Sequence, residues 1–250
     1  MEWRDEGIII GLRKHGETSL IVELMTRAHG RHMGIVKGGR SRRMQPTLQQ
    51  GNSVEVTWRA RLEEHLGLFT LEVGKVRAAE IMSSPLALAG INLMGELLRL
   101  LPERDPHETL YDMATAMADH LGEPELGPAL MVRFELEVLS ELGFRLDLSQ
   151  CAATGRNDEL IYVSPKTGRA VSAAAGEPYK DRLLPLPAFL RGLSWQGVPD
   201  RAEIADGFRL TGYFLDRDVL QPRGGAEKLT RRSYLTAAGL AMIDPAGGKS

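Results

Sequence analysis

The hydrophobic period of this chain changes near residue 84, and that change predicts two kinds of structure in succession. Before it, short apolar runs alternate with polar residues and end at glycine-containing turns, which is the pattern of half-buried strands. In the run 53–64 the residues predicted to face the core are Val54, Val56, Trp58 and Leu62. Five such runs in the first 80 residues, the last over 67–80, have no convincing helix between them. They predict a small closed barrel of the OB type, with an SH3-like barrel as the alternative.

From residue 84 onward the apolar positions recur with the helical period. Ser84 before Pro85 is predicted to begin a buried helix, and Gly143 is predicted to end a later one. The predicted helices cover residues 83–101, 105–121, 127–143, 186–193, 202–220 and 231–243. Residues 150–180 interrupt them, because they lose the helical period and are rich in Gly, Pro, Ser and Asn. We therefore predict a two-domain α+β protein, with a barrel over 1–80 and a mostly helical domain over 81–250 that carries a β insertion at about 150–180.

Composition narrows the class of protein further. A single cysteine excludes an internal disulfide framework and is typical of a reducing cytoplasm. The longest apolar run, residues 86–101, is interrupted by polar and charged residues, so we expect no membrane span. No nucleotide-binding or nucleophile-elbow motif is present, so we predict a protein that is not an enzyme and needs no cofactor. His29 and His32 lie beside cationic residues and are expected to be solvated and not to bind a metal.

Residues 150–180 contain the spacing of a zinc ribbon without its ligands. A four-cysteine module has two C-x2-C knuckles separated by 15–20 residues, because tetrahedral zinc needs four ligands. The corresponding positions here are Cys151, Thr154, Ser172 and Ala175. One thiolate cannot hold zinc with useful affinity, so we predict a zinc-ribbon-like insertion that binds no metal. A glycine-rich hairpin that never bound a metal is the alternative.

Positive charge is concentrated in one segment of a chain whose formal net charge is -2. Residues 1–80 carry 13 Lys or Arg and 10 Asp or Glu, whereas the remaining residues carry 18 and 23. The segment 27–43 holds six Lys or Arg and no acid, and it includes the turn sequence GIVKGGRSRR. Such a segment repels itself, which indicates an anionic ligand, with a solvated turn as the alternative.

The order of these parts resembles the RecO family of recombination mediators. The resemblance extends from residue 5 to about residue 242 and is most specific in residues 6–43, 133–155 and 162–172. It implies an OB domain, a helical domain, and a role in binding single- and double-stranded DNA and annealing complementary strands. It also implies two partners, RecR and the C-terminal tail of the single-stranded-DNA-binding protein, through which RecA is loaded onto DNA. A cytoplasmic, nucleoid-associated protein is expected.

The resemblance also assigns candidate residues. The DNA-binding residues it implies are Lys37 and Arg40 and, less directly, Arg27, Arg31, Arg42, Arg43, Arg59 and Arg61, the last two predicted on the polar face of the fourth strand. Arg133, beside Phe134, is a candidate for the rim of the pocket that takes the acidic tail, with a helix-surface pair to Glu137 as the alternative.

Several alternatives remain open at the level of sequence. Residue patterns alone do not separate DNA from RNA, so an RNA-binding OB protein is the second hypothesis. A third is an adaptor that acts through its helical domain while the barrel is structural. The sequence does not settle the oligomeric state, the RecR docking surface, or whether Lys228, Arg231 and Arg232 extend the DNA path.

Overall fold

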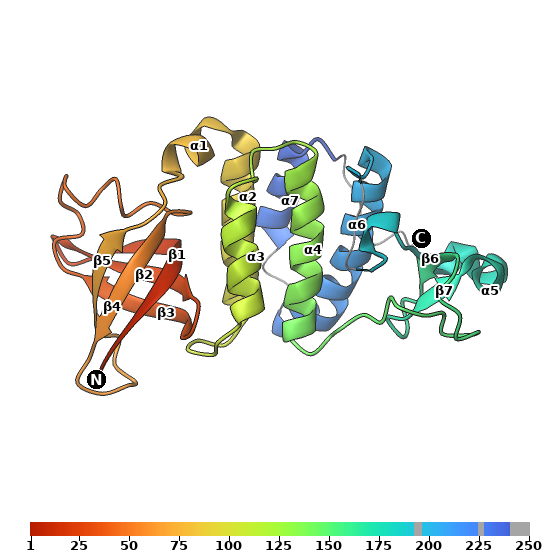
Figure 1. Ribbon diagram of the computed structural model, residues 1–250, viewed down its shortest axis with the longest axis horizontal. Helices are drawn as coiled ribbons and strands as arrows, with labels where there is room; N and C mark the ends of the chain where they lie inside the picture. The colour runs from red at the N-terminus through yellow and green to blue at the C-terminus, as the bar shows by residue number, and fades with distance from the viewer. Residues whose placement is uncertain (193–196, 225–227, 241–250) are drawn as a thin grey trace. The chain divides into compact units, whose positions relative to one another are not determined.

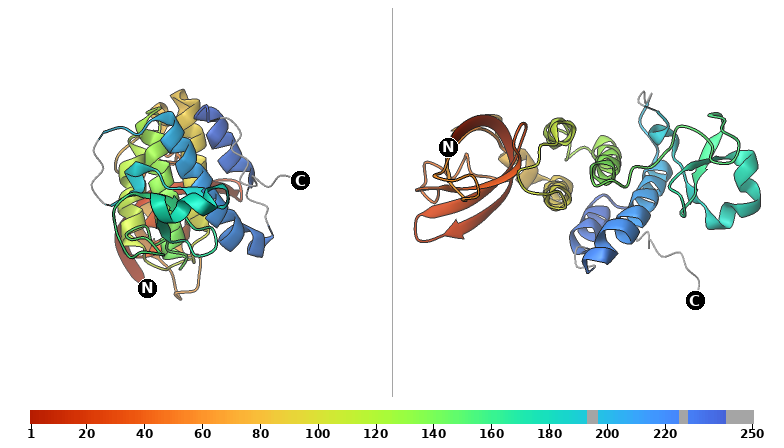
Figure 2. Two further views of the ribbon diagram at one scale, coloured as in Figure 1. Left: turned by 90° about the vertical axis from the view of Figure 1, so that its right-hand side faces the viewer. Right: turned by 90° about the horizontal axis from the view of Figure 1, so that it is seen from below.

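The computed structural model describes residues 1–192, 197–224 and 228–240, and the chain divides into two compact units, Met1–Gly122 and Glu123–Ser250. The first unit contains the barrel and the second contains helices and a small sheet (Figures 1 and 2). The predicted α+β class, with an N-terminal barrel followed by a helical region, is confirmed.

Five strands of the first unit close into a barrel in the order β1-β2-β3-β5-β4 (Figure 1). These strands are β1 (Glu2–His15), β2 (Ser19–Thr26), β3 (Gly30–Val36), β4 (Ser53–Arg59) and β5 (Leu68–Val73). Neighbouring strands are antiparallel except β3 and β5, which run parallel and are paired at Ile35 and Leu68. This arrangement is the predicted OB-type barrel.

The barrel core is formed mainly by strand residues that alternate with exposed or partly exposed neighbours. Buried inside it are Ile9, Val22, Leu24, Val36, Leu48, Val54, Val56, Trp58 and Phe69. The prediction for the fourth strand is confirmed up to Trp58 and is wrong beyond it, because β4 ends at Arg59 and Leu62 is 46% exposed. The last pairs of β4 are Glu2–Arg59 on β1 and Arg59–Leu68 on β5, so no strand remains for residues 60–64 to pair with. Arg61 therefore lies in the connection after β4 and not on its polar face.

Three helices belong to the same compact unit as the barrel. They are α1 (Ala78–Ser83), α2 (Pro85–Arg99) and α3 (Glu108–Ala118) (Figure 1). As predicted, α2 begins after Ser84, whose side chain accepts a hydrogen bond from the amide of Ala87 at 3.2 Å. The prediction of a strand over 67–80 is wrong at its end, because β5 stops at Val73 and α1 follows.

Arg77 attaches the barrel to α3. Its side chain is 2% exposed and donates to the carboxylate of Asp119 at 2.6 Å, to the hydroxyl of Ser53 at 2.7 Å and to the carbonyl of Gly51 at 3.2 Å. These contacts explain why the first compact unit continues to residue 122, past the end of the barrel strands. The domain boundary at residue 80 stays a prediction.

The second unit is built on α4 (Leu126–Glu141) and α6 (Arg201–Phe214), which pack against each other. As predicted, Gly143 terminates this helix: α4 ends at Glu141, Leu142 is its C-cap, and Gly143 follows with a φ of +88° that favours glycine. Asp200 and Glu203 form a capping box that begins α6. The remaining helical segments are α5 (Ala173–Gly176), η1 (Glu177–Arg182), η2 (Ala188–Leu190), the π-helical turn η3 (Leu215–Leu220), η4 (Gln221–Arg223) and α7 (Lys228–Ala237).

The β insertion forms a three-stranded sheet in the order β7-β6-β8. Its strands are β6 (Leu160–Val163), β7 (Ala170–Ser172) and β8 (Leu184–Pro185). The helix predicted over 186–193 is wrong for residues 186–192, where the single turn η2 forms and Gly192 adopts a φ of +84°; residue 193 lies outside the described part of the chain. The helix predicted over 231–243 ends at Ala237, and residues 241–243 lie outside the described part of the chain.

Candidate nucleic-acid interface

The basic segment forms an exposed turn after β3. Gly38 adopts a φ of +65°, and the amide of Ser41 donates to its carbonyl at 3.0 Å, which closes the turn. The side chains of Lys37, Arg40, Arg42 and Arg43 are exposed. Within the described residues, no ion pair is recorded for Lys37, Arg42 or Arg43, so their charges face solvent.

Arg40 holds this turn against the hairpin that joins β1 to β2. Its amide donates to the carbonyl of Thr18 at 3.0 Å, and its guanidinium donates to the carbonyls of Gly16 and Glu17. Arg40 is therefore a positioning residue as well as a cation, because its contacts fix where the turn lies.

The hairpin brings cations to the turn that sequence reasoning missed. The pairing register places Lys14 opposite Leu20 and Leu20 opposite Val36, so Lys14 lies in the strand row next to Lys37. Arg13 and His15 are exposed on the same hairpin. The pairing register of β1 with β2 identifies these residues, whereas the local charge run does not, because they lie 22 to 30 positions before the cations of the turn. We call Arg13, Lys14, Lys37, Arg40, Arg42 and Arg43 the basic end of the barrel.

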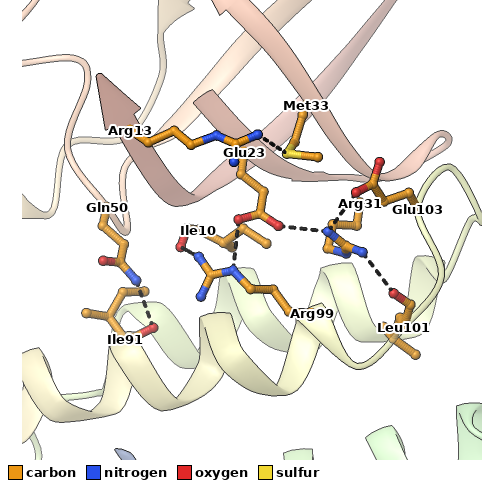
Figure 3. A network of polar contacts seen from close by, with 10 residues as sticks. All are labelled: Ile10, Arg13, Glu23, Arg31, Met33, Gln50, Ile91, Arg99, Leu101 and Glu103. Atoms are coloured by element: carbon orange, nitrogen blue, oxygen red, sulfur yellow. Dashed lines mark hydrogen bonds and ion pairs between the residues drawn. The ribbon is translucent and has the colours of Figure 1, made fainter. Parts of the chain in front are cut away.

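Two of the candidate DNA-binding arginines, Arg27 and Arg31, each pair with two carboxylates of the first unit. Arg31 is 13% exposed in its side chain and donates to Glu23 at 2.9 Å, to Glu103 at 3.4 Å and to the carbonyl of Leu101 at 3.3 Å (Figure 3). Arg27 is 45% exposed and pairs with Glu6 at 3.3 Å and with Asp112 at 3.1 Å. We therefore leave Arg31 out of the proposed DNA path. To bind DNA, Arg27 would have to release one of its carboxylate partners and contact a phosphate instead.

Arg59 lies farther around the barrel. The strand pairing sets Arg13, Ile21, Ile35, Leu68 and Arg59 in one row, each directly opposite the next. Arg59 pairs with Glu2 at 2.8 Å, yet its side chain remains 61% exposed. Arg59 is two strand steps from Ile35, roughly 10 Å at the usual spacing between strands. A DNA strand that follows this row from the basic end to Arg59 would cross the side chains of Ile35 and Leu68.

The two histidines of the basic segment are not both solvated. His29 is 34% exposed in its side chain, and its Nδ1 lies 2.9 Å from the carboxylate of Asp5. The prediction is wrong for His32, which is 3% exposed and packs against Trp3, Trp58 and Phe69. Burial, assisted by the charges of Arg104 and His29, lowers the pKa of His32 to about 4. His32 is therefore neutral near pH 7.

In the β insertion, hydrogen bonds join Cys151 to Ser172 and Thr154, which occupy positions where a zinc ribbon has its metal ligands. Cys151 is buried, and its sulfur accepts from the amide of Ser172 at 3.3 Å and lies 3.5 Å from the Ser172 hydroxyl. Burial acts to raise the pKa of Cys151, but hydrogen bonds from the hydroxyls of Ser172 and Thr154 outweigh it and lower the pKa to about 6. The residues at the four ligand positions do not fit zinc, and residues 1–192, 197–224 and 228–240 contain no cluster of three or more metal-ligating side chains.

The candidate residues of the helical unit differ in how they are engaged. Arg133 on α4 is half-buried and donates to the carbonyl of Phe189, and burial lowers its pKa. Arg231 on α7 donates to the fully buried carboxylate of Glu135 at 2.7 Å and 3.1 Å, so it is not available to extend a DNA path. Arg232 is exposed, and the side chain of Lys228 lies outside the described part of the structure.

Nearly the whole chain is similar to proteins of one known family. The family model described as recombination protein O N terminal matches residues 1–79, and the one described as recombination protein O C terminal matches residues 82–226. A protein of Methylorubrum populi named DNA repair protein RecO is 60% identical over 228 residues, which cover 89% of this chain and 92% of the relative. Proteins with the same name from Methylocella silvestris and Rhodopseudomonas palustris are 57% and 54% identical and cover 94% and 98% of this chain, and 95% and 99% of their own lengths. In the described residues, every helix is too short or too polar to cross a bilayer.

Proposed function

This chain belongs to the RecO family of DNA repair proteins, and from that premise we propose that it is a non-enzymatic recombination mediator. It binds single- and double-stranded DNA, anneals complementary strands, and helps RecR load RecA onto DNA coated by the single-stranded-DNA-binding protein. It acts in the cytoplasm in association with the nucleoid.

The basic end of the barrel is the observation that carries this proposal. It gathers six cations from the β1–β2 hairpin and from the turn after β3, and none of the six has an ion pair among the described residues. Each phosphate that such a cation neutralises releases counterions, which drives binding without reading sequence. Annealing has the same requirement, because two polyanionic strands must be held close together. The turn is preorganised by Arg40, so little conformational freedom is lost on binding.

The proposal is tested by binding and annealing measured side by side. We expect fluorescence anisotropy to show salt-dependent binding to single-stranded DNA and to duplex DNA, and we expect faster annealing of complementary oligonucleotides. The same measurement with single-stranded RNA of equal length tests the RNA-binding hypothesis, because that hypothesis requires tighter binding to RNA than to DNA. Absence of DNA binding at low salt would contradict the proposal, and annealing without any contribution from the barrel would favour the adaptor hypothesis.

For the partner site we propose that Arg133 lies at the rim of the surface that takes the C-terminal tail of the single-stranded-DNA-binding protein. Its guanidinium is attached to the carbonyl of Phe189 on η2, which fixes a cation beside the buried aliphatic residues of α4. We expect R133Q to weaken binding of a tail peptide, because the substitution removes the charge and keeps a hydrogen-bond donor. R232Q removes an exposed charge from the same unit and serves as the control. Equal affinity of R133Q and the unmodified protein would remove Arg133 from the site.

A further inference from the structure

Three aromatic rings form a stacked column that runs from the barrel core to the surface. The rings of Trp58 and Trp3 are stacked with centroids 5.6 Å apart and an interplanar angle of 19°. The rings of Trp3 and His29 are stacked more closely, at 4.1 Å and 9°. The order of the column is therefore Trp58, Trp3, His29.

Exposure increases along this column. Trp58 is 1% exposed, Trp3 is half-buried and the side chain of His29 is 34% exposed. Trp3 covers one face of the His29 ring and Asp5 occupies its Nδ1 edge, so these contacts leave the opposite face and the remaining edge of the ring open. The column thus ends at the surface on a flat ring that lies parallel to the indole beneath it.

The last ring of the column is fixed in place. The carboxylate of Asp5 accepts from His29 Nδ1 at 2.9 Å and from the amide of Ala28 at 2.8 Å, so it orients the ring and the turn that carries it. His32 packs edge-on against Trp3 and Trp58, with ring centroids 5.1 Å from each. A ring held in this way presents a stacking surface without losing rotamer freedom when a ligand arrives.

Folding of the barrel accounts for Trp58 but not for the outer end of the column. Trp58 fills the core and its indole donates to the carbonyl of Leu66 at 3.1 Å. His29 lies in the turn between β2 and β3, outside that core, yet it is stacked and hydrogen-bonded as a fixed platform. Flat, preorganised aromatic surfaces on barrels of this type suit the π-face of any nucleobase.

We infer that the exposed face of His29 is a stacking subsite for one unpaired base of single-stranded DNA. This inference rests on the proposed function, since it concerns a strand that the basic end already holds. The strand β3 separates the two places, and its seven residues span roughly 20 Å. Single-stranded DNA occupies about 4–16 nucleotides on an OB fold, so one strand can reach both. The basic end supplies phosphate contacts, and His29 supplies a contact that requires a base and tolerates any sequence.

The test compares two probes that carry the same number of phosphates. One is an oligothymidylate, and the other is a chain of abasic sugar phosphates of equal length. In H29A we expect the affinity for the oligothymidylate to fall about fivefold, which corresponds to the lower end of the range for stacking of one base on an aromatic ring. The affinity for the abasic chain should not change. H29F restores a flat ring without the hydrogen bond to Asp5 and should retain most of the oligothymidylate affinity.

Controls make the outcomes separable. H65A removes an exposed histidine from the β4–β5 connection of the same barrel and should leave both affinities unchanged. Thermal melting verifies that each variant is folded, and a folded H29F keeps the comparison valid if H29A is not. If H29A binds the oligothymidylate as tightly as the unmodified protein, or loses affinity for both probes alike, the subsite is overturned while DNA binding stands. If the unmodified protein binds neither probe, the proposed function fails, and the subsite fails with it.

Discussion

The guanidinium of Arg99 on α2 donates to the carboxylate of Glu23 on β2 at 2.8 Å, and this contact joins a helix to the barrel. Glu23 is 13% exposed and also accepts from Arg31 at 2.9 Å, so one carboxylate holds two cations (Figure 3). Arg99 further donates to the carbonyl of Ile10 at 2.8 Å, where β1 has a bulge. The pairs make the barrel and α2 parts of one compact unit.

We predict that E23Q destabilises the protein by about 1–3 kcal/mol, because charge-assisted hydrogen bonds to two guanidinium groups are weakened in a partly buried place. Urea unfolding followed by circular dichroism measures the effect. E177Q is the matched control, since it removes a carboxylate from an exposed pair with Lys180 and should change stability little. DNA affinity of folded E23Q should remain unchanged if the network is structural. A large loss of DNA affinity in that variant would return Arg31 to the DNA path.

The second unit contains an ion pair whose carboxylate is more deeply buried than that of Glu23. Glu135 is fully buried, and its charge is balanced by Arg231 of α7, with Thr211 donating a further hydrogen bond. We predict that R231M costs about 3–5 kcal/mol, because a buried carboxylate is left without its partner. The double variant E135M/R231M should recover much of that loss, since the unpaired charge is gone. Urea unfolding measures the stability of both variants. Equal stability of the single and double variants would contradict the explanation that the unpaired carboxylate of Glu135 causes the loss.

Local periodicity predicted the barrel, but its limits depend on distant residues. The alternation in 53–64 continues past Arg59, whereas β4 stops there because β1 and β5 offer no further partner. The charge run 27–43 likewise gives no sign that Arg31 is neutralised, since Glu23 and Glu103 approach it only in the folded barrel. Lys14 was missed for the same reason, because only the pairing register places it near Lys37.

The stability of the barrel should depend on pH through His32. Burial lowers its folded-state pKa to about 4, compared with about 6.5 when unfolded. The folded state therefore binds fewer protons, so this contribution is fully present above pH 6.5 and is lost as the pH falls from 6.5 toward 4. The loss can reach about 3 kcal/mol.

In H32F an aromatic ring still packs against the two tryptophans, but the titrating group is gone. We expect the urea midpoint of the unmodified protein to fall more steeply than that of H32F between pH 7 and pH 5. Protonation of carboxylates at low pH lowers the stability of both proteins alike, so this effect cancels when their urea midpoints are compared. Parallel pH profiles would mean that His32 is not kept neutral by the fold.

The basic end of the barrel gives the sharpest prediction for DNA binding. Lys37 and Arg43 are the best pair to remove, because both are exposed and neither has a recorded ion pair among the described residues, whereas Arg40 also positions the turn. For single strands the slope of log affinity against log salt is about -0.7 per phosphate contact, so K37A/R43A should flatten the slope by about 1.4. Affinity should fall alike for all sequences, and strand annealing should fall in parallel. K166A/R182A removes the same charge from exposed positions of the second unit and should leave the slope unchanged. An unchanged slope in K37A/R43A, with DNA still bound, would show that the turn is only a solvated connection and that the phosphates are held elsewhere.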